Sequence, residues 1–220
     1  MADVLYRRKR RHAADSMLES ALRYARLGWP VVRGAAPGQD RACTCDRMGC
    51  PDPAAHPVTM AWGVEASTDP ERIRGWWTAT PDANVILPTG RVFDVFDVPR
   101  EAGVMALARM GRSGVPAGPV AAVEASRYLF FVATRSPVDE DEWWSCHLDT
   151  VPESVEATPG LRWHCRDSFV PGAPSVLPSG GRVTWIRAPR DEDGAGVPLP
   201  DPIAVLDILS DASEEFPDRG

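Results

Sequence analysis

Two apolar runs in the middle of the chain, Asn84–Leu87 and Val92–Val98, limit the possible folds more than any other pattern. Each run has the length of a buried strand and is too short for a helix. Pro88, Thr89 and Gly90 separate the runs, so the sequence predicts two strands around a tight turn. The 22 prolines and 18 glycines disfavour a helical bundle and favour short strands joined by turns.

Helices and strands are predicted in mixed order along the rest of the chain. Helices are expected over residues 16–28, 68–80, 100–112 and 202–209, and strands over residues 29–32, 120–124, 128–133 and 183–187. Capping-box spacing marks the starts of the first two helices, at Ser16 and Thr68. The expected core faces consist of Leu18, Ala21, Leu22 and Ala25 in the first helix and of Val104, Leu107 and Ala108 in the third. Because helices and strands do not alternate strictly, we expect an α+β fold around one sheet system.

Charge is distributed unevenly along the chain. Residues 1–33 carry eight Lys or Arg and three Asp or Glu, a net charge of +5, so the −7 of the whole chain leaves −12 for residues 34–220. A surface that follows nucleic-acid phosphates is usually basic, so the acidic body argues against strong nucleic-acid binding. The basic run at residues 7–12 is expected to be a solvated, disordered tail, with phosphate contact as the alternative.

The expected organisation is simple. It comprises a basic tail over residues 1–14, one domain over residues 15–210 with a loop insertion at about 40–58, and an acidic tail over residues 211–220. No apolar stretch approaches the roughly 18 residues of a membrane span, and no apolar run follows the basic tail as in a secretion signal. We therefore expect a cytoplasmic protein without a membrane partner.

A cluster of metal-binding residue types lies within fourteen residues, as Cys43, Cys45, Cys50 and His56. Its segment, roughly residues 34–61, is rich in Gly, Pro and Cys and has no hydrophobic period. Thiolates and imidazole suit tetrahedral Zn²⁺, and such close spacing lets a short loop wrap around the ion. The pattern predicts a structural zinc loop. The alternative is a disulfide, which five cysteines and the lack of a secretion signal disfavour.

Two other Cys/His pairs are adjacent in the sequence, Cys146-His147 and His164-Cys165. Adjacent residues of a strand point to opposite faces of a sheet. We therefore interpret both pairs as ordinary core or surface positions.

Several short motifs follow one another between residues 15 and 190. They are Gly28-Trp29-Pro30-Val31, the Cys/His segment closing on His56-Pro57, Trp62, the run from Thr68 to Trp77, Pro81-x-Ala83-Asn84, Ala173-Pro174-Ser175, Pro178-Ser179-Gly180-Gly181 and Trp185. Their order resembles the N-terminal domain of bifunctional DNA primase/polymerases, the Prim-Pol family of the archaeo-eukaryotic primase superfamily. The resemblance implies an α+β primase-like domain with its active site on a sheet between two small subdomains. It also implies nucleotidyl transfer by two metal ions that carboxylates hold.

The same resemblance assigns the catalytic positions, and most of them are altered. Asp97 matches the first of the family's two strand acids, but Pro99 stands where the second should be. Tyr128 stands where the family has a phosphate-contacting histidine, and Arg162 aligns with the third acid. Three of the four positions that carry the family's chemistry therefore hold residues that cannot perform it.

Other residues near these positions are weaker candidates. Asp94 is three residues from Asp97, which places it on the opposite face of a regular strand. Ser126 and Arg127 lie in the stretch that matches the histidine motif, and Arg127 is a candidate phosphate contact, with an ordinary exposed arginine as the alternative. Asp167 lies near the third acid but out of register.

Two functions from different classes follow. The first is a catalytically degenerate Prim-Pol-like protein that keeps a structural zinc and binds a nucleotide, a nucleic acid or a protein partner, with weak nucleic-acid affinity. The second is an active DNA primase/polymerase with a rearranged site of Asp94, Asp97 and Asp167, which would need Mg²⁺ or Mn²⁺. A scaffold that binds zinc and no nucleotide is a third possibility.

Overall fold

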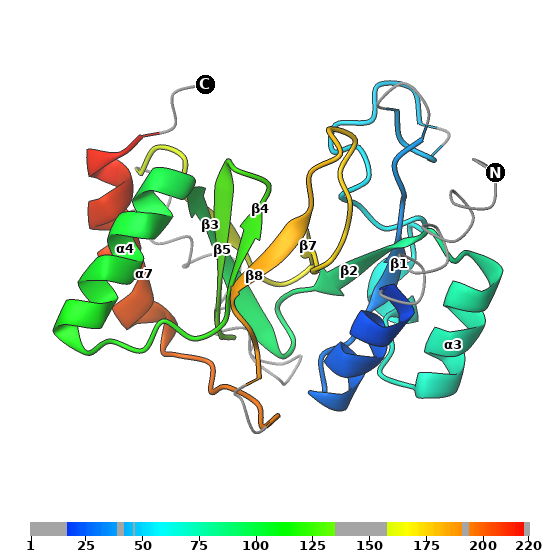
Figure 1. Cartoon of the computed structure of the whole chain (residues 1–220), viewed down its shortest axis with the longest axis horizontal. Coiled ribbons are helices and arrows are strands. Elements are labelled where there is room, and N and C mark those ends of the chain that lie inside the picture. Colours follow the sequence, from blue (N-terminus) through cyan, green and yellow to red (C-terminus); the bar gives the residue numbers. More distant parts are fainter. Residues whose placement is uncertain (1–16, 39–41, 46, 135–157, 191–193, 218–220) are drawn as a thin grey trace, which may run out of the picture. The chain divides into compact units, whose positions relative to one another are not determined.

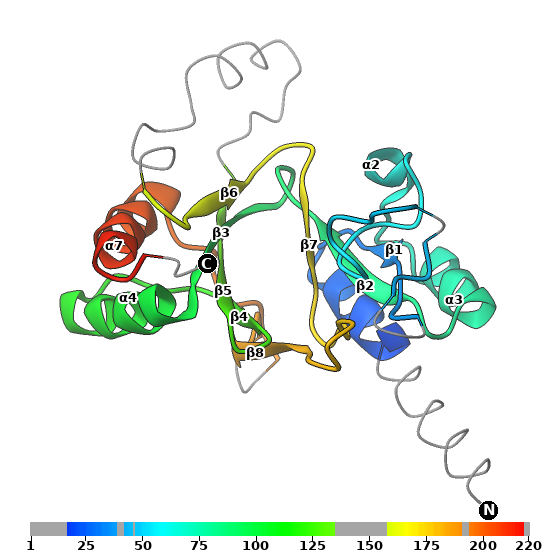
Figure 2. The same ribbon diagram turned by 90° about the horizontal axis from the view of Figure 1, so that it is seen from above.

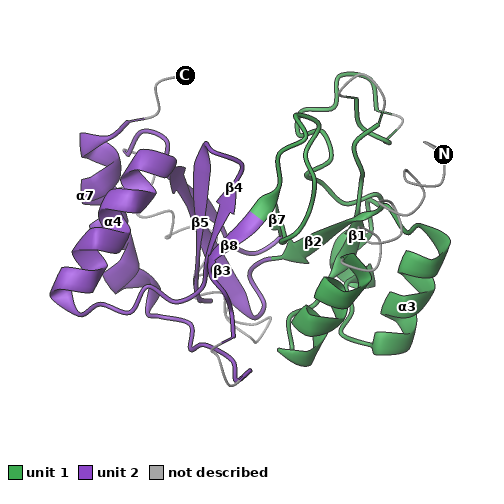
Figure 3. Ribbon diagram, viewed as in Figure 1, with its two compact units in different colours: residues 1–88, 169–183 green, residues 89–168, 184–220 purple. Residues whose placement is uncertain are grey.

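The computed structural model describes residues 17–38, 42–45, 47–134, 158–190 and 194–217 (Figure 1). The chain divides into two compact units (Figure 3). Unit 1 comprises residues 1–88 and 169–183, and unit 2 comprises residues 89–168 and 184–220. The expected basic tail over residues 1–14 and the predicted cap Ser16 lie outside the described residues.

Unit 1 is built around a three-stranded antiparallel sheet. The order is β1-β2-β7, with bounds Val32–Gly34, Asn84–Pro88 and Phe169–Pro171. The helices of this unit cover residues 17–26, Trp62–Glu65 (α2) and Pro70–Ala79 (α3).

Buried hydrogen bonds tie distant segments of unit 1 to its central strand. Asn84 is fully buried, and its Nδ2 donates to the carbonyl oxygens of Ala54 and Val176, each at 2.8 Å. The Ser175 hydroxyl donates to the carbonyl of Val85 at 3.0 Å and accepts from the Val85 amide at 3.1 Å. Two of the polar residues in the sequence motifs therefore have structural roles, since each satisfies backbone groups that folding removes from water.

Unit 2 is built around a five-stranded sheet in the order β6-β3-β5-β4-β8. The bounds are Arg162–His164 (β6), Phe93–Pro99 (β3), Arg127–Ala133 (β5), Val120–Val123 (β4) and Val183–Arg187 (β8), whose first residue closes unit 1. Two helices, α4 (Arg100–Ser113) and α7 (Pro202–Glu215), lie together on one face of this sheet (Figure 2).

The core of unit 2 lies between these helices and the sheet. It includes Phe96 and Phe130 from the central strands and Met110 and Leu209 from the helices. At Gly103 of α4 an added Cβ would lie 2.7 Å from the Cβ of Tyr128, so the helix can approach the sheet this closely only with glycine at that position.

The predicted α+β class is confirmed, and most predicted elements are present. The expectation of one sheet system is wrong, because β2 and β3 belong to different sheets and do not pair. Pro88, Thr89 and Gly90 therefore lead from one unit to the other instead of closing a hairpin. The sequence showed two buried strands, but partner choice depends on residues far away in the chain.

Several local predictions also need correction. The first strand, β1, begins at Val32, whereas residues 29–32 were expected. The second helix is capped by Asp69, whose Oδ1 accepts from the Glu71 amide at 2.9 Å, and not by Thr68. The last helix extends to Glu215. Strands β6 and β7 were not predicted, because each has only three residues and therefore no clear period.

The predicted core faces of two helices are displaced. The first helix buries Met17, Ala21 and Tyr24, and α4 buries Ala102, Gly103, Ala106 and Met110. Val104 of α4 is half exposed. Small residues let α4 approach the sheet, so its buried face follows close packing more than side-chain hydrophobicity. Among the described residues no helix is long and apolar enough to cross a membrane.

Candidate functional site

The Cys/His segment of unit 1 gathers its four predicted ligands. The ligand atoms of Cys43, Cys45, Cys50 and His56 all lie within 4.8 Å of one another. The Cys43 Sγ and the His56 Nε2 are 3.3 Å apart. His56 is buried, and the three cysteines are partly exposed. The four side chains therefore form one site that could hold a metal ion.

The loop that carries these residues is held by its own backbone. The Thr44 amide donates to the Ala36 carbonyl at 2.9 Å, and the Ala36 amide donates to the Thr44 hydroxyl at 2.8 Å. This pairing fixes the residue between Cys43 and Cys45, so an unusual Cys-x-Cys spacing can still direct two sulfurs to one site. The return of the loop lies beside β1, where the Ala35 amide donates to the His56 carbonyl at 2.9 Å.

The surroundings of the cluster suit metal binding. A carbonyl oxygen can only accept, so the 2.7 Å contact between His56 Nδ1 and the Pro57 oxygen makes Nδ1 the donor. In the neutral tautomer with its hydrogen on Nδ1, the Nε2 atom has its lone pair toward the sulfurs, as a ligand must. The Ala54 amide also donates to the Cys43 sulfur at 3.3 Å, and Asn84 anchors the Ala54 carbonyl. Three sulfurs and one imidazole nitrogen are the donor set of a closed tetrahedral site.

The thiols of the cluster differ in acidity. The pKa of Cys45 is lowered to about 7, chiefly because the Arg47 backbone amide hydrogen-bonds to its sulfur. The pKa of Cys50 is raised to about 11 by loss of solvation and by its hydrogen bond with Cys45. A bound cation favours the thiolate form of each ligand, because it attracts the negative sulfur.

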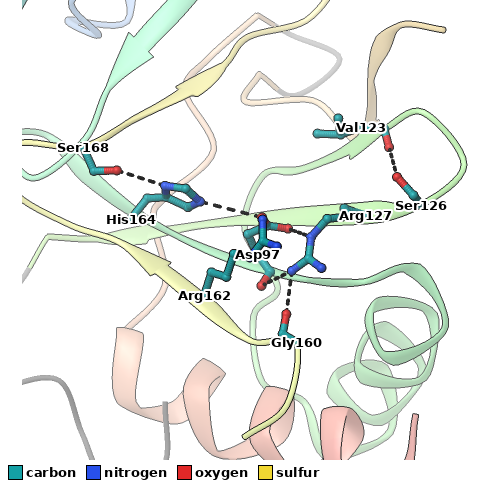
Figure 4. A network of polar contacts seen from close by, with 8 residues as sticks. All are labelled: Asp97, Val123, Ser126, Arg127, Gly160, Arg162, His164 and Ser168. Carbon is teal, nitrogen blue, oxygen red and sulfur yellow. Dashed lines mark hydrogen bonds and ion pairs between the residues drawn. The ribbon is translucent and has the colours of Figure 1, made fainter. Parts of the chain in front are cut away.

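A second group of charged residues lies on the sheet of unit 2, around Asp97 of β3 (Figure 4). Residues opposite each other in antiparallel strands share a face. Asp97 pairs with Arg162 of β6, and its same-face neighbours Val95 and Pro99 pair with His164 of β6 and Arg127 of β5. This face is opposite the one that packs on α4 and α7.

Arg127 holds the Asp97 carboxylate directly. Its Nε donates to Asp97 Oδ1 at 2.5 Å, and its Nη2 donates to the carbonyl oxygens of Asp97 at 3.0 Å and of Gly160 at 2.5 Å. The side chains of Arg127 and Asp97 are only 15% and 9% exposed. Burial of this kind makes the pair hard to separate, because each charge would remain in a poorly solvated place.

The other carboxylate oxygen of Asp97 faces two further nitrogen groups. Its Oδ2 lies 3.9 Å from Arg162 Nη1 and 3.7 Å from His164 Nε2. His164 Nδ1 is 3.0 Å from the Ser168 hydroxyl (Figure 4). One carboxylate is thus surrounded by two guanidinium groups and an imidazole.

The remaining predicted residues do not converge on Asp97. Asp94 is fully buried and pairs with Val132, so it lies on the opposite face of β3 from Asp97. Its carboxylate accepts from the Thr134 hydroxyl at 3.0 Å. Asp167 is exposed in the turn between β6 and β7, with a positive φ of 60°. In the described part of the chain the Cys/His cluster is the one group of three or more His, Cys, Asp or Glu placed to share a metal ion.

Ser126 and Tyr128 have structural positions. The Ser126 hydroxyl donates to the Val123 carbonyl at 3.3 Å in the turn between β4 and β5, and its own carbonyl accepts from the first amide of α4. Tyr128 is buried on the helical face of the sheet, against Gly103. Tyr128, which was expected at the position of the family's histidine, therefore lies in the core, whereas Arg127 is the residue on the Asp97 face.

His164 was interpreted from the sequence as an ordinary position, and that interpretation missed its place beside Asp97. The available signal was alternation, since Arg162 and His164 are two residues apart and share a face of any strand that contains both. It could be used only once β6 was recognised. Cys165, the next residue, has its pKa raised by burial and by the nearby Asp94.

Comparison with known proteins gives one family. The family described as bifunctional DNA primase/polymerase, N-terminal, matches residues 21–204. No curated protein matches the chain significantly. The match spans both units and includes the Cys/His cluster as well as Asp97. This chain therefore belongs to the family of N-terminal domains of bifunctional DNA primase/polymerases.

Proposed function

We propose that this chain is a Prim-Pol domain that has lost nucleotidyl transfer and serves as a nucleotide- or nucleic-acid-related binding or regulatory protein. The observation that carries the proposal is the state of Asp97, whose carboxylate is held by Arg127 and faced by Arg162 and His164. This acid matches the family's first metal ligand. Its engagement by arginines therefore bears directly on whether a catalytic metal can bind.

Charge is the physical reason. Two divalent ions close together repel each other, and carboxylates must offset that repulsion before the ions can bind the triphosphate. Around Asp97, one carboxylate faces two guanidinium groups, so the formal charge of the three residues is +1 instead of strongly negative. A divalent cation placed there would be repelled by both arginines.

The alternative is an active primase/polymerase with a rearranged site, in which Mg²⁺ or Mn²⁺ binds Asp94, Asp97 and Asp167. Asp94 and Asp97 lie on opposite faces of β3, and the Asp94 carboxylate accepts from the Thr134 hydroxyl. A shared metal would require β3 to bulge or turn. The degenerate hypothesis needs no such change.

We further propose that the Cys/His cluster holds a structural zinc ion. Four protein ligands leave no position for water or substrate, which favours a structural over a catalytic role. The ion would order the loop, and the sulfur ligands must stay reduced, a condition that the cytoplasm maintains. We place the protein there, and we include a protein partner among its possible ligands.

The test is a primer-extension and de novo priming assay with Mg²⁺ and with Mn²⁺. The expected result is no template-dependent incorporation by the wild-type protein. Asp94→Asn, Asp97→Asn and Asp167→Asn are assayed beside it, because these changes keep side-chain size. Incorporation by the wild type that any of these variants abolishes would refute the proposal and establish the rearranged enzyme.

Nucleic-acid binding is tested separately. Because residues 34–220 carry a net charge of −12, affinity for single-stranded or primed DNA is expected to be weak and to fall steeply with salt. Deleting residues 1–14 is expected to remove most of it. Tight binding by the truncated protein at physiological salt would contradict the proposal and favour the polymerase.

A further inference from the structure

The Asp97 face has more positive than negative charge, because two arginines lie beside one carboxylate. Arg127 is committed to Asp97 and to the Gly160 carbonyl. Arg162 is different: its guanidinium reaches Asp97 only at 3.9 Å, outside hydrogen-bond distance, and its side chain is 64% exposed. Within the described residues, the Arg162 side chain has no other ion pair or hydrogen bond.

His164 lies next to Arg162 on the same face of β6. Its Nδ1 is engaged with the Ser168 hydroxyl, while its Nε2 remains 3.7 Å from the Asp97 carboxylate. The imidazole is three-quarters buried, so its direction is largely fixed. The exposed guanidinium of Arg162 and the imidazole of His164, which Ser168 holds, thus both lie beside the Asp97 carboxylate (Figure 4).

We propose that Arg162 and His164 form a binding site for a phosphate group that works without a divalent metal. This inference rests on the proposed function, and it names the chemistry of the ligand. A guanidinium binds phosphate with two parallel hydrogen bonds, and an imidazole nitrogen supplies a third. Asp97 and Arg127 hold the base of the site, and the unneutralised charge of Arg162 attracts the anion.

In such a site the guanidinium takes the place of a metal ion as the positive group that binds phosphate. Where carboxylates hold metals, the metals bind the phosphates, and removing them abolishes binding. Here the guanidinium supplies the positive charge itself. Binding therefore does not require Mg²⁺, and millimolar Mg²⁺ weakens it, because Mg²⁺ competes for the phosphate oxygens.

The experiment uses the full chain in buffer freed of Mg²⁺ and Mn²⁺ by dialysis, without a strong chelator that would strip the Cys/His cluster. Calorimetry measures binding of inorganic pyrophosphate, of a deoxynucleoside triphosphate and of a single-stranded oligonucleotide, with adenosine as the ligand that lacks phosphate. The expected result is binding of at least one phosphate ligand, none of adenosine, and no strengthening on addition of Mg²⁺. The three phosphate ligands distinguish a free phosphate, a nucleotide and a nucleic-acid backbone as the source.

Three variants assign the site. Arg162→Ala is expected to weaken binding by about tenfold or more, the usual effect of losing a charged hydrogen bond. Arg162→Lys, which keeps the charge but not the planar pair of donors, is expected to lose less. Arg112→Ala is the control, because Arg112 is exposed on α4, on the helical side of the sheet, and gives the same change in net charge.

His164→Gln tests the imidazole separately, and a smaller loss than for Arg162→Ala is expected. Equal binding by Arg162→Ala and the wild type, absence of any phosphate binding, or binding that appears only with Mg²⁺ would each overturn the inference. These outcomes are separate from failure of the proposed function, since that failure is seen as nucleotide incorporation in the primer assay. A protein that is inert in both experiments refutes the phosphate site alone.

Discussion

The Cys/His cluster of unit 1 and the Asp97 face of unit 2 differ in how complete their ligand sets are. In unit 1, three cysteines and a histidine come from fourteen residues of sequence and converge within 4.8 Å. In unit 2, a single acid lies on the face, and the residues that strands β5 and β6 place beside it are arginines and a histidine. Among the described residues, only the first of these places has a set of three or more donors that could share a metal ion.

The difference shows that the backbone positions of a site and the residue types at those positions can change independently. A strand register places a side chain on a face whatever that side chain is, so β3, β5 and β6 bring four residues together, Asp97 and the three residues around it. The charge of those residues then decides whether the face attracts a cation or an anion. The comparison predicts different responses of the two sites to metal and to substitution.

The largest effect is expected for a ligand of the Cys/His cluster. Cys45→Ser should reduce zinc from about one ion per chain to almost none, because a closed site needs all four donors. The loop over residues 34–61 should then be cleaved faster by protease, since it has no hydrophobic core of its own. Metal analysis and limited proteolysis give the two readouts.

Cys165→Ser is the matched control, because Cys165 lies in unit 2 and outside the cluster. Its metal content should equal that of the wild type. Full zinc in the Cys45→Ser protein, or no zinc in the wild type with an equally resistant loop, would contradict the structural zinc site.

The next effect is expected at the buried ion pair. Arg127→Ala should lower the free energy of unfolding by about 3 kcal/mol, because it leaves the Asp97 carboxylate poorly solvated and without its main partner. Urea unfolding measures this loss. The double variant Asp97→Ala/Arg127→Ala should lose less than the sum of the single variants. Additive losses would show that the two side chains do not stabilise each other.

Helix caps offer a smaller effect that can be compared between the units. Asp69 accepts one amide at the start of α3, and Asp201 accepts two at the start of α7, at 2.8 and 3.2 Å. Each change to Ala should cost about 1 kcal/mol, with Asp201→Ala at least as harmful as Asp69→Ala. Thermal unfolding of both variants tests the order, and a clearly larger loss at Asp69 would reverse it.

The smallest effect is expected for an exposed ion pair. Arg74 Nη1 lies 2.6 Å from Glu71 on α3, but the two side chains are 49% and 84% exposed. Arg74→Ala should change stability by about 0.3 kcal/mol, because water already solvates both charges. The contrast with Arg127→Ala measures what burial adds, and similar losses for the two variants would remove that distinction.

Sequence patterns predicted those elements, and the ligand cluster, whose residues lie close together in the chain. The α+β class, the strands around Val95 and Phe130, and the Cys/His cluster follow from spacing within a few residues. The pairing of strands did not follow, because β2 and β3 are close in sequence but belong to different sheets. The short strand β6 was not predicted for a different reason, since three residues carry no period of their own.

The sequence by itself determined that this chain has a local Cys/His set of metal-ligand type, and its resemblance to the family led to the prediction that three catalytic positions are altered. Only the tertiary structure decided which side chains surround Asp97. The register of β3 against β5 and β6 places Arg127, Arg162 and His164 around Asp97, and it turns Tyr128 into the helical core. The physical reason is that ligands on one loop are joined by chain connectivity, whereas residues on three strands meet only through hydrogen-bonded pairing between distant segments.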